Sequence, residues 1–547
     1  NYKNGGLIIH STIDSRIQNF LEDSFNETIL NTKKGLQNQF NKSILNTEDA
    51  YNNRLKDICS YIEDDRIGVF NDSVYINLNR EIRLLSSPSE KDYENKDTNH
   101  NFSNKISQLK NRRIIIRDSL RQECFIQVKQ VLRNDSIPIN LRSKLLVQGA
   151  AIIFDIKTGS VLGMLGGRLE DQYHDYFNRA TKAERQPGSI FKPFVYLSAI
   201  KEGHSPYTKL KNQAIKIWDK SEFWEPENWN NEVGGIYTLR QGLYGSVNLI
   251  AVRILRDLAI SPFSVKNTAQ NFKFTTDMNP VPSIALGSSE VKPIEIISAY
   301  SAVANLGTYL KPIIINKIMD SDGKLIKSFL PEPEAVNSES ASYILLDMMR
   351  DVVDEYKFKY QDENNNGNYD KDEHVYSRGT GHKLRTKYNF GFEYDDYNGN
   401  GIFDYNRQDE INSSKITIPC AGKTGTTNFQ TDAWFIGFTP EISMGVWIGM
   451  DDKRISLGKT LYGSSAALPV FAETMNKIYD LGNYNLNTNN YNLISNNDSW
   501  DYIPEGVLKI KVCEDEKGDF CKANKYCRDS YEALFLKDFA PPECSNN

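Results

Sequence analysis

The 547-residue chain has no run of about 18 consecutive apolar residues, which is the length that a membrane-spanning helix needs. No signal peptide is recognisable, and the chain begins at Asn1 rather than at methionine. We therefore expect a processed or truncated piece of a longer protein, in which a missing N-terminal part supplies any membrane anchor. There is no excess of positive charge either. A net charge of −6 and a pI near 5.8 give no reason to expect a nucleic-acid partner.

The seven cysteines contain no Cys-x-x-Cys pair of the kind that binds zinc. Cys59, Cys124 and Cys420 are isolated in the sequence, whereas the other four crowd the last segment: Cys513, Cys521, Cys527 and Cys544. This crowding favours a disulfide-bonded tail and an oxidising compartment over four reduced thiols. Four cysteines allow three connectivities, and the sequence does not choose among them.

Patterning divides the chain into a mainly helical N-terminal part and a mixed C-terminal part. The alternating run 6–14 predicts a strand, and an amphipathic helix is expected from Ser15 to about Leu30. Residues 46–145 continue with helical patterns, among them the charged run 112–133, and are interrupted by the polar stretch 86–104. They contain no recognisable chemical motif, so we interpret them as a helical spacer or docking region.

From Gln148 onward the pattern changes to buried strands. The runs 150–156 and 160–165 predict a strand pair, and Lys157-Thr158-Gly159 between them predicts a hairpin turn. The chain from Ser189 to about Asn316 is expected to be mainly helical. Residues 416–450, rich in aromatic and β-branched residues, predict a second sheet region. Strands on both sides of a helical block indicate one sheet assembled from distant parts of the chain.

The sequence Arg185-Gln186-Pro187-Gly188-Ser189 places a serine directly after a turn-forming Pro-Gly pair, and Lys192 follows three residues later. On a helix starting near Ser189 the two side chains would share a face, with the serine at the positive end of the helix dipole. The spacing alone decides little, because five other pairs share it: Ser107/Lys110, Ser198/Lys201, Ser289/Lys292, Ser321/Lys324 and Ser456/Lys459. The case for Ser189 depends on the motifs that accompany it.

Two further motifs follow Ser189 in a meaningful order. Ser246-Val247-Asn248 offers a hydroxyl and an amide, and Lys423-Thr424-Gly425 begins the aromatic sheet region. Ser-x-x-Lys, then Ser-x-Asn, then Lys-Thr-Gly is the triplet of penicillin-binding proteins and related serine β-lactamases. Further segments carry the same resemblance: 178–180, 185–189, 238–240, 285–287, 304–307 and 421–427. Residues 146–475 thus resemble the transpeptidase part of class A (bifunctional) penicillin-binding proteins.

The resemblance implies an α/β (α+β) fold of the penicillin-binding protein and serine β-lactamase type. It implies an antiparallel sheet of about five strands, flanked by helices and accompanied by a helical subdomain. The family's glycosyltransferase motif is not found, since Glu63-Asp64 lacks the residues that should follow it. We expect a segment leading into the transpeptidase domain at 1–45, the spacer at 46–145, the domain itself at 146–478 with acidic insertions near 357–376 and 386–414, and a cysteine-containing tail at 479–547.

The chemistry that the resemblance implies is acyl transfer from D-Ala-D-Ala stem peptides of peptidoglycan through a covalent Ser189 intermediate. Lys192 would act as the base, Ser246 would relay the proton, and Asn248 would hold Lys192 and the substrate amide. The oxyanion hole would be the backbone N–H groups of Ser189 and Thr426. The carboxylate-binding strand would contribute Lys423, Thr424, Gly425, Thr426 and Thr427. β-Lactams would acylate Ser189, and the compartment would be the periplasmic face of the bacterial inner membrane.

Two acidic insertions precede Lys423 and have the oxygen-ligand spacing of an EF-hand calcium loop. The candidate ligands of the first are Asp362, Asn364, Asn366, Asn368, Asp370 and Glu373, where Asn368 would contribute its backbone carbonyl. Those of the second are Asp396, Asn398, Asn400, Ile402 and Asp404, but its twelfth position is Arg407. The alternative is a pair of solvated, Asn-rich turns. Catalysis itself needs no cofactor, so we expect a structural Ca²⁺ if any.

Rival functions remain at this stage. A DD-carboxypeptidase differs only in the acyl acceptor. A class A β-lactamase needs a deacylating glutamate with a Glu-x-x-x-Asn context, and none is suitably placed. A non-enzymatic β-lactam sensor or cell-wall scaffold is the rival from another class. The complete set of five polar motif residues argues against it.

Overall fold

The computed structural model describes residues 6–31, 35–45, 55–60, 77–78, 80–82, 96–134, 136–170, 175–219, 222–354, 358–360, 375–378, 386–388, 391–392, 420–458, 460–481, 503–514, 520–525, 527 and 530–544. These residues fall into two compact units. The larger contains 1–28, 148–449 and 459–547, and the smaller contains 29–147 and 450–458. No helix within the described ranges has both the length and the apolar character needed to cross a bilayer.

The larger unit is built around a five-stranded sheet with the order β16-β17-β18-β2-β3. Its strands are β16 (Ala421–Thr426), β17 (Asp432–Phe438), β18 (Ile442–Met450), β2 (Val147–Asp155) and β3 (Val161–Leu165). The pairs β16/β17, β17/β18 and β2/β3 are antiparallel. The sheet therefore joins residues near 150 to residues near 430, as the sequence predicts, and the expected turn at 157–159 connects β2 to β3.

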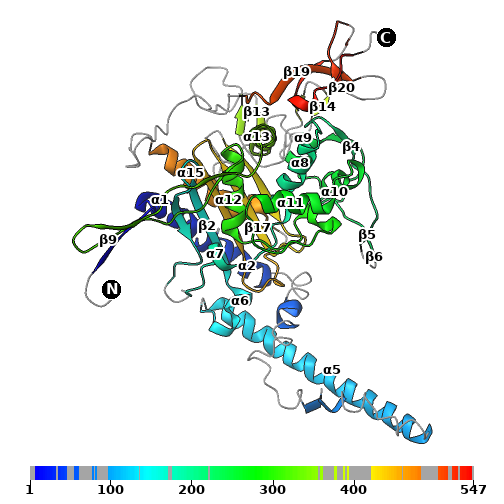
Figure 1. Ribbon diagram of the computed structural model, residues 1–547. Coiled ribbons are helices and arrows are strands. Elements are labelled where there is room, and N and C mark those ends of the chain that lie inside the picture. Colours follow the sequence, from blue (N-terminus) through cyan, green and yellow to red (C-terminus); the bar gives the residue numbers. More distant parts are fainter. Residues whose placement is uncertain are drawn as a thin grey trace, which may run out of the picture. The chain divides into compact units, whose positions relative to one another are not determined.

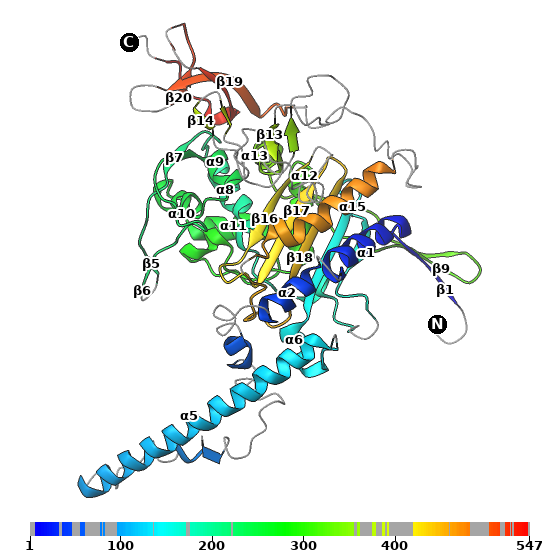
Figure 2. The same cartoon turned by 180° about the vertical axis from the view of Figure 1, so that it is seen from behind.

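Helices cover both faces of this sheet (Figures 1 and 2). On one face, α12 (Pro293–Ala304) approaches so closely that a Cβ on Gly445 of β18 would lie 2.3 Å from Ile297. On the other face, α15 (Leu468–Asp480) packs so that a Cβ on Gly437 of β17 would lie 2.6 Å from Phe471. α1 (Ser15–Leu30) lies on this second face, with Phe25 against Gly149 of β2. Glycines in the strands thus let helices dock on both sides.

The remaining helices form the subdomain on the α12 side. Its helices are α7 (Arg179–Lys182), α8 (Lys192–Lys201), α9 (Leu239–Tyr244), α10 (Asn248–Asp257), α11 (Pro262–Asn271) and α13 (Glu339–Asp354), with 3₁₀ turns at Gly188–Phe191 and Pro282–Leu286. α8 is buried along almost its whole length. Its Phe194 meets the rings of Phe191, Phe272, Phe274 and Tyr300 at centroid distances of 5.3–6.2 Å. This aromatic cluster fixes the helix that carries Lys192.

The larger unit also contains small sheets of two or three short strands. They comprise β1 (Leu7–Ser11) with β9 (Ile315–Asp320) and β10 (Leu325–Ser328), β8 (Thr308–Leu310) with β11 (Pro333–Ala335), β4 (Lys209–Lys211) with β7 (Ile236–Thr238), β5 (Ile217–Asp219) with β6 (Glu222–Trp224), β12 (Phe358–Tyr360) with β13 (Val375–Arg378), and β14 (Thr386–Tyr388) with β15 (Gly391–Phe392). The expectation that 189–316 is mainly helical holds for its longer elements, α8 to α12, but it did not include the short strands β4 to β7. Exposed aromatic residues such as Trp218 and Phe223 suit these short hairpins better than a helix.

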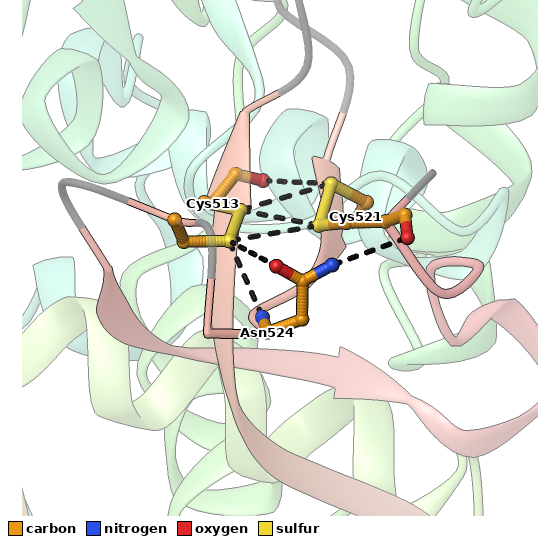
Figure 3. The surroundings of a disulfide bond; sticks show 5 residues. Cys513, Cys521 and Asn524 are labelled. Atoms are coloured by element: carbon orange, nitrogen blue, oxygen red, sulfur yellow. Dashed lines mark hydrogen bonds between the residues drawn. A yellow bond between two sulfur atoms is a disulfide. The ribbon is translucent and has the colours of Figure 1, made fainter. Parts of the chain in front are cut away.

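The C-terminal part of the larger unit is a three-stranded sheet with the order β20-β19-β21, whose strands are β20 (Phe520–Lys522), β19 (Val507–Glu514) and β21 (Tyr531–Leu536). Its own buried cluster consists of Val512, Ala533 and Phe535, which is little for an independent core. Disulfides join Cys513 to Cys527 and Cys521 to Cys544. The predicted disulfide-bonded tail is therefore present, with one of the three connectivities that the sequence left open. Figure 3 shows Asn524 beside these bonds, where its Nδ2 donates to the Cys544 carbonyl at 3.3 Å.

The smaller unit contains α2 (Leu36–Leu45), α5 (Lys96–Arg133) and α6 (Arg142–Leu145). A disulfide joins Cys59 to Cys124, which are isolated from other cysteines in the sequence. The sequence did not predict this pairing, because 65 residues separate two thiols that only the fold brings together. α5 begins at Lys96, inside the stretch 86–104 that we expected to interrupt the helical pattern. Lys144 and Asp452 form a buried ion pair at 2.5 Å.

Candidate functional site

Ser189 lies in the 3₁₀ turn Gly188–Phe191, directly before α8. The sequence predicts a helix starting near Ser189, and the α-helix itself starts three residues later, at Lys192. The reason is the backbone at Gly188, whose φ of 54° turns the chain into a tight 3₁₀ hydrogen bond from the Lys192 N–H to the Ser189 carbonyl. Ser189 is partly exposed, so its hydroxyl is reachable at the N-terminal end of a buried helix.

Lys192 is completely buried, and its amine contacts the second motif. Nζ lies 2.6 Å from the Ser246 carbonyl oxygen, 2.8 Å from Asn248 Oδ1 and 3.3 Å from Ser246 Oγ. Burial lowers the pKa of Lys192 well below its ordinary value, and the nearby Lys423 charge lowers it further. A lowered pKa increases the share of the neutral amine, which is the form that can accept a proton.

Ser246 occupies a strained position between two helices. Its φ of 50° is in the left-handed region, which is costly for a residue with a Cβ. The Ser246 N–H donates to the Leu243 carbonyl at 3.1 Å and the Val247 N–H to the Gly242 carbonyl at 2.9 Å, and α10 begins directly after this turn at Asn248. Asn248 Nδ2 donates to the Glu227 carbonyl at 2.8 Å, so the amide oxygen faces Lys192. Strain and hydrogen bonding together fix where the Ser246 hydroxyl points.

Lys423, on the edge strand β16, reaches the same hydroxyl from the other side. Its Nζ lies 2.9 Å from Ser246 Oγ and 3.2 Å from the Thr424 carbonyl oxygen, and the residue is completely buried. Burial lowers the pKa of Lys423 to about 7. Two buried amines therefore flank one hydroxyl, an arrangement in which protons can move between the three groups.

The strand that carries Lys423 lies against the turn that carries Ser189. A Cβ on Gly188 would lie 2.8 Å from the Thr426 carbonyl oxygen, and a Cβ on Gly425 would lie 2.7 Å from the Pro187 carbonyl oxygen. Thr426 Oγ1 accepts a hydrogen bond from the Gly463 N–H at 3.0 Å, and Thr424 is partly exposed. Thr427 is buried and binds Thr431 through its hydroxyl. The two candidate oxyanion donors, the N–H groups of Ser189 and Thr426, thus belong to backbone segments in direct contact.

The structure brings together Ser189, Lys192, Ser246, Asn248 and Lys423, which lie up to 234 residues apart in the chain (423 minus 189). Sequence reasoning missed supporting residues beside them. Gly287 (φ 70°) packs against Gly188, where a Cβ would lie 2.2 Å from the Gly188 carbonyl oxygen. A Cβ on Gly463 would lie 2.6 Å from the Gly425 carbonyl oxygen. Gly287 was part of the resemblance but had no assigned role. For Gly463 the sequence offers no signal beyond the glycine itself.

The eleven candidate calcium ligands, from Asp362 to Asp404, lie outside the described residues. Within the described ranges, one group of metal-ligand residues is close enough to hold an ion, namely Cys513, Cys521 and Cys544. These three cysteines are all joined in disulfides, so their sulfur atoms offer no thiolate to a metal.

Comparison with known proteins agrees with this geometry. Residues 149–370 match the family model described as the penicillin binding protein transpeptidase domain, a range that includes Ser189, Lys192, Ser246 and Asn248 but ends before Lys423. Penicillin-binding protein 1A of Aquifex aeolicus is 33% identical over 331 residues, which are 60% of this chain and 38% of that protein. The protein of the same name from Neisseria lactamica is 33% identical over 368 residues, 65% of this chain and 38% of its own length. The chain thus spans well under half the length of these relatives.

Comparison with solved structures also finds similarity to a penicillin-binding protein. A crystal structure of penicillin-binding protein 1A from Haemophilus influenzae superimposes with a TM-score of 0.53 at 20% sequence identity, covering 73% of this chain and 54% of that one. This similarity establishes the fold, including the five-stranded antiparallel sheet that the sequence analysis expected.

We predict that Gly188→Ala destabilises the larger unit more than Gly323→Ala does. Both glycines have a positive φ, but a Cβ at Gly323 would meet nothing nearer than 4.0 Å, whereas one at Gly188 would lie 2.8 Å from the Thr426 carbonyl oxygen. The left-handed conformation costs roughly 1–2 kcal/mol in each variant, and the overlap adds about 1–3 kcal/mol at Gly188. Urea unfolding measures the difference, and equal losses of unfolding free energy would contradict the close packing.

Proposed function

We propose, on the basis that this chain contains a transpeptidase domain of the penicillin-binding protein family, that Ser189 cross-links peptidoglycan stem peptides as a serine-type D-Ala-D-Ala acyltransferase. The observation that carries the proposal is the Ser246 hydroxyl, which is contacted by the buried amines of both Lys192 and Lys423. A serine hydroxyl is a poor nucleophile unless a base removes its proton. The pair of desolvated lysines supplies that base at neutral pH.

In the first step, neutral Lys192 takes the Ser189 proton while Oγ attacks the carbonyl carbon of the D-Ala-D-Ala peptide bond. The negative charge on the tetrahedral oxygen would be stabilised by the N–H groups of Ser189 and Thr426, each such donor typically contributing ~3 kcal/mol. The C–N bond then breaks. The leaving amine of the terminal D-Ala takes a proton through Ser246, and the acyl group stays on Ser189.

In the second step, the amine of a neighbouring stem peptide attacks the acyl-enzyme carbonyl and gives up a proton through the same groups in reverse. The ester C–O bond to Ser189 then breaks, the new amide bond is the cross-link, and Ser189 Oγ regains its proton. Substrate orientation would come from Lys423 with the hydroxyls of Thr424 and Thr426, which would bind the terminal carboxylate. A bound carboxylate favours the charged ammonium, so donor binding raises the pKa of Lys423 above about 7.

The oxidising environment that the cysteines indicate supports an extracytoplasmic site of action, at the periplasmic face of the inner membrane. All three disulfides of the described residues would be unstable in a reducing cytosol. Membrane attachment through a segment outside this chain is part of the same proposal, with peptidoglycan as substrate and β-lactams as inhibitors.

We expect a fluorescent penicillin to label the protein stably through Ser189. Label should be lost in Ser189→Ala and kept in Ser107→Ala, a matched control with the same Ser-x-x-Lys spacing on an exposed part of α5. Gel fluorescence after timed quenching distinguishes the alternatives. Rapid loss of label would indicate a β-lactamase, and absence of label in the folded protein would indicate a scaffold. Transfer to an amine rather than to water separates a transpeptidase from a carboxypeptidase.

Acylation should show a bell-shaped pH dependence. At low pH the rate falls because Lys192 becomes protonated and ceases to be a base. Above about pH 7 it falls because Lys423 loses the charge that binds the penicillin carboxylate in the free enzyme. Both limbs are measured as the second-order acylation rate constant at a series of pH values. In Lys423→Arg the alkaline limb should move up by at least about two pH units, since arginine stays charged. Lys311→Arg, at an exposed lysine, should leave the profile unchanged, and a flat wild-type profile from pH 6 to 9 would refute this assignment.

We also propose that the insertion from Asp362 to Glu373 binds a structural Ca²⁺, and that the insertion from Asp396 to Asp404 is a weaker second candidate. The support is the regular oxygen-ligand spacing, which occurs twice. Terbium luminescence tests it. We expect a signal that calcium competes away and that Asp362→Ala reduces. Lack of a calcium-competable signal in the intact protein would end the proposal.

A further inference from the structure

The segment before Ser189 is fixed residue by residue. Arg185 exchanges backbone hydrogen bonds with Val291 at 3.0 and 2.9 Å, and the Gln186 carbonyl accepts from Trp434 Nε1 at 2.9 Å. The Gly188 N–H donates to the Gly287 carbonyl at 3.2 Å. Residues 185–188, which we call the strap, are therefore held on several sides. The position of Ser189 depends on the groups to which this strap is bonded.

The strongest attachment is the buried side chain of Arg185. Its Nε donates to Asp432 Oδ1 at 2.6 Å, and its guanidinium lies 4.8 Å from the ring centroid of Trp447. The side chains of Arg185 and Asp432 are only 3% and 4% exposed. Trp447 Nε1 donates to the same carboxylate oxygen at 2.9 Å, which links the strap to β18 as well as β17.

Asp432 also closes the turn between β16 and β17. Its second oxygen, Oδ2, accepts from Thr431 Oγ1 at 2.8 Å. Its backbone N–H donates to Thr427 Oγ1 at 3.1 Å, and its carbonyl accepts from the Thr427 N–H at 3.2 Å. In the strand ladder, Thr426 is paired with Ala433, the residue after Asp432. Asp432 thus contacts both segments: its carboxylate binds Arg185 and Thr431, whose hydroxyl meets that of Thr427 at 2.9 Å, and its backbone binds Thr427 directly.

A purely structural role is a weak explanation for this ion pair. Removing two charges from water costs several kcal/mol, and well-packed apolar replacements are often neutral or stabilising. The ion pair and its hydrogen bonds instead provide direction, because they fix Arg185 and Thr431 at defined positions around one carboxylate. Oxyanion stabilisation requires such defined positions, since hydrogen-bond donors act only at about 2.7–3.1 Å from the developing charge.

We propose that Arg185 and Asp432 are positioning residues for the reaction, which set the separation of the Ser189 and Thr426 N–H groups and thereby the stabilisation of the tetrahedral oxygen. This inference rests on the proposed function. It assigns the two residues no contact with substrate and no proton to transfer. Their loss should slow acylation without weakening the initial binding of a β-lactam.

The test is stopped-flow acylation by a penicillin, which separates the dissociation constant of the initial complex from the acylation rate constant. The variants are Asp432→Asn and Arg185→Lys. Asp432→Asn keeps the shape but loses the charge, and Arg185→Lys keeps the charge but loses the Nε geometry and the stacking on Trp447. The matched control is Asp452→Asn, which breaks the buried Lys144–Asp452 ion pair of the smaller unit. Active-site titration normalises each rate to enzyme that is able to react.

We expect the acylation rate constant to fall about 10- to 100-fold in both positioning variants, somewhat less than the loss of a whole oxyanion donor, with the dissociation constant unchanged within about twofold. The affinity for a boronic acid that forms a tetrahedral adduct should fall by a similar factor. The control should lose thermal stability but keep its rate constant. If Asp432→Asn does not fold, Arg185→Lys decides the outcome alone.

Unchanged rate constants in the active fraction of both variants would overturn the inference, and so would a loss confined to initial binding. Wild-type protein that is not acylated at all would instead refute the proposed function, so the two failures are distinguishable.

Discussion

The contact of two buried lysine amines with one serine hydroxyl is the constraint on which this structure depends. Lys192 and Lys423 are both completely buried, and burial lowers the pKa of each. At neutral pH the unfolded chain binds protons that the folded chain partly gives up, so these lysines cost stability, and the cost grows as the pH falls. The aromatic core around α8 and the five-stranded sheet offset this cost. A buried lysine with a lowered pKa, three residues after Ser189, is the result.

Close backbone approach is the second constraint, and it explains why glycines rather than reactive residues line the contact. Gly188, Gly287, Gly425 and Gly463 each lie where a Cβ would be 2.2–2.8 Å from a neighbouring carbonyl oxygen. The turn that carries Ser189 and the strand β16 can meet at this distance only without side chains between them. The Arg185–Asp432 ion pair joins the residues before Ser189 to the start of β17. The contacts of the two lysines with Ser246, the close packing of the glycines and the Arg185–Asp432 ion pair thus lie in one continuous set of contacts.

The sequence allowed prediction of those features that depend on local pattern or motif order. It identified α1 from its periodicity, the turn at 157–159 from its residues, and the motif set of Ser189, Ser246 and Lys423 from its order. It did not reveal long-range pairing, because nothing near Cys59 indicates Cys124 and nothing near Arg185 indicates Asp432. The short strands β4 to β7 were missed for a related reason. Three-residue strands are too short for an alternating pattern to be recognised.

The proposed chemistry requires a neutral Lys192. Carbon-13 NMR of lysine labelled at Cε measures the charge of this amine directly, and the signal is assigned by its loss in Lys192→Arg. The account predicts that the Lys192 signal has the chemical shift of a neutral amine at pH 7 and moves toward that of an ammonium only on acidification. It also predicts that Lys423→Met shifts this transition to higher pH, because the Lys423 charge lowers the pKa of Lys192. A Lys192 signal that stays that of an ammonium up to pH 9 would contradict the account.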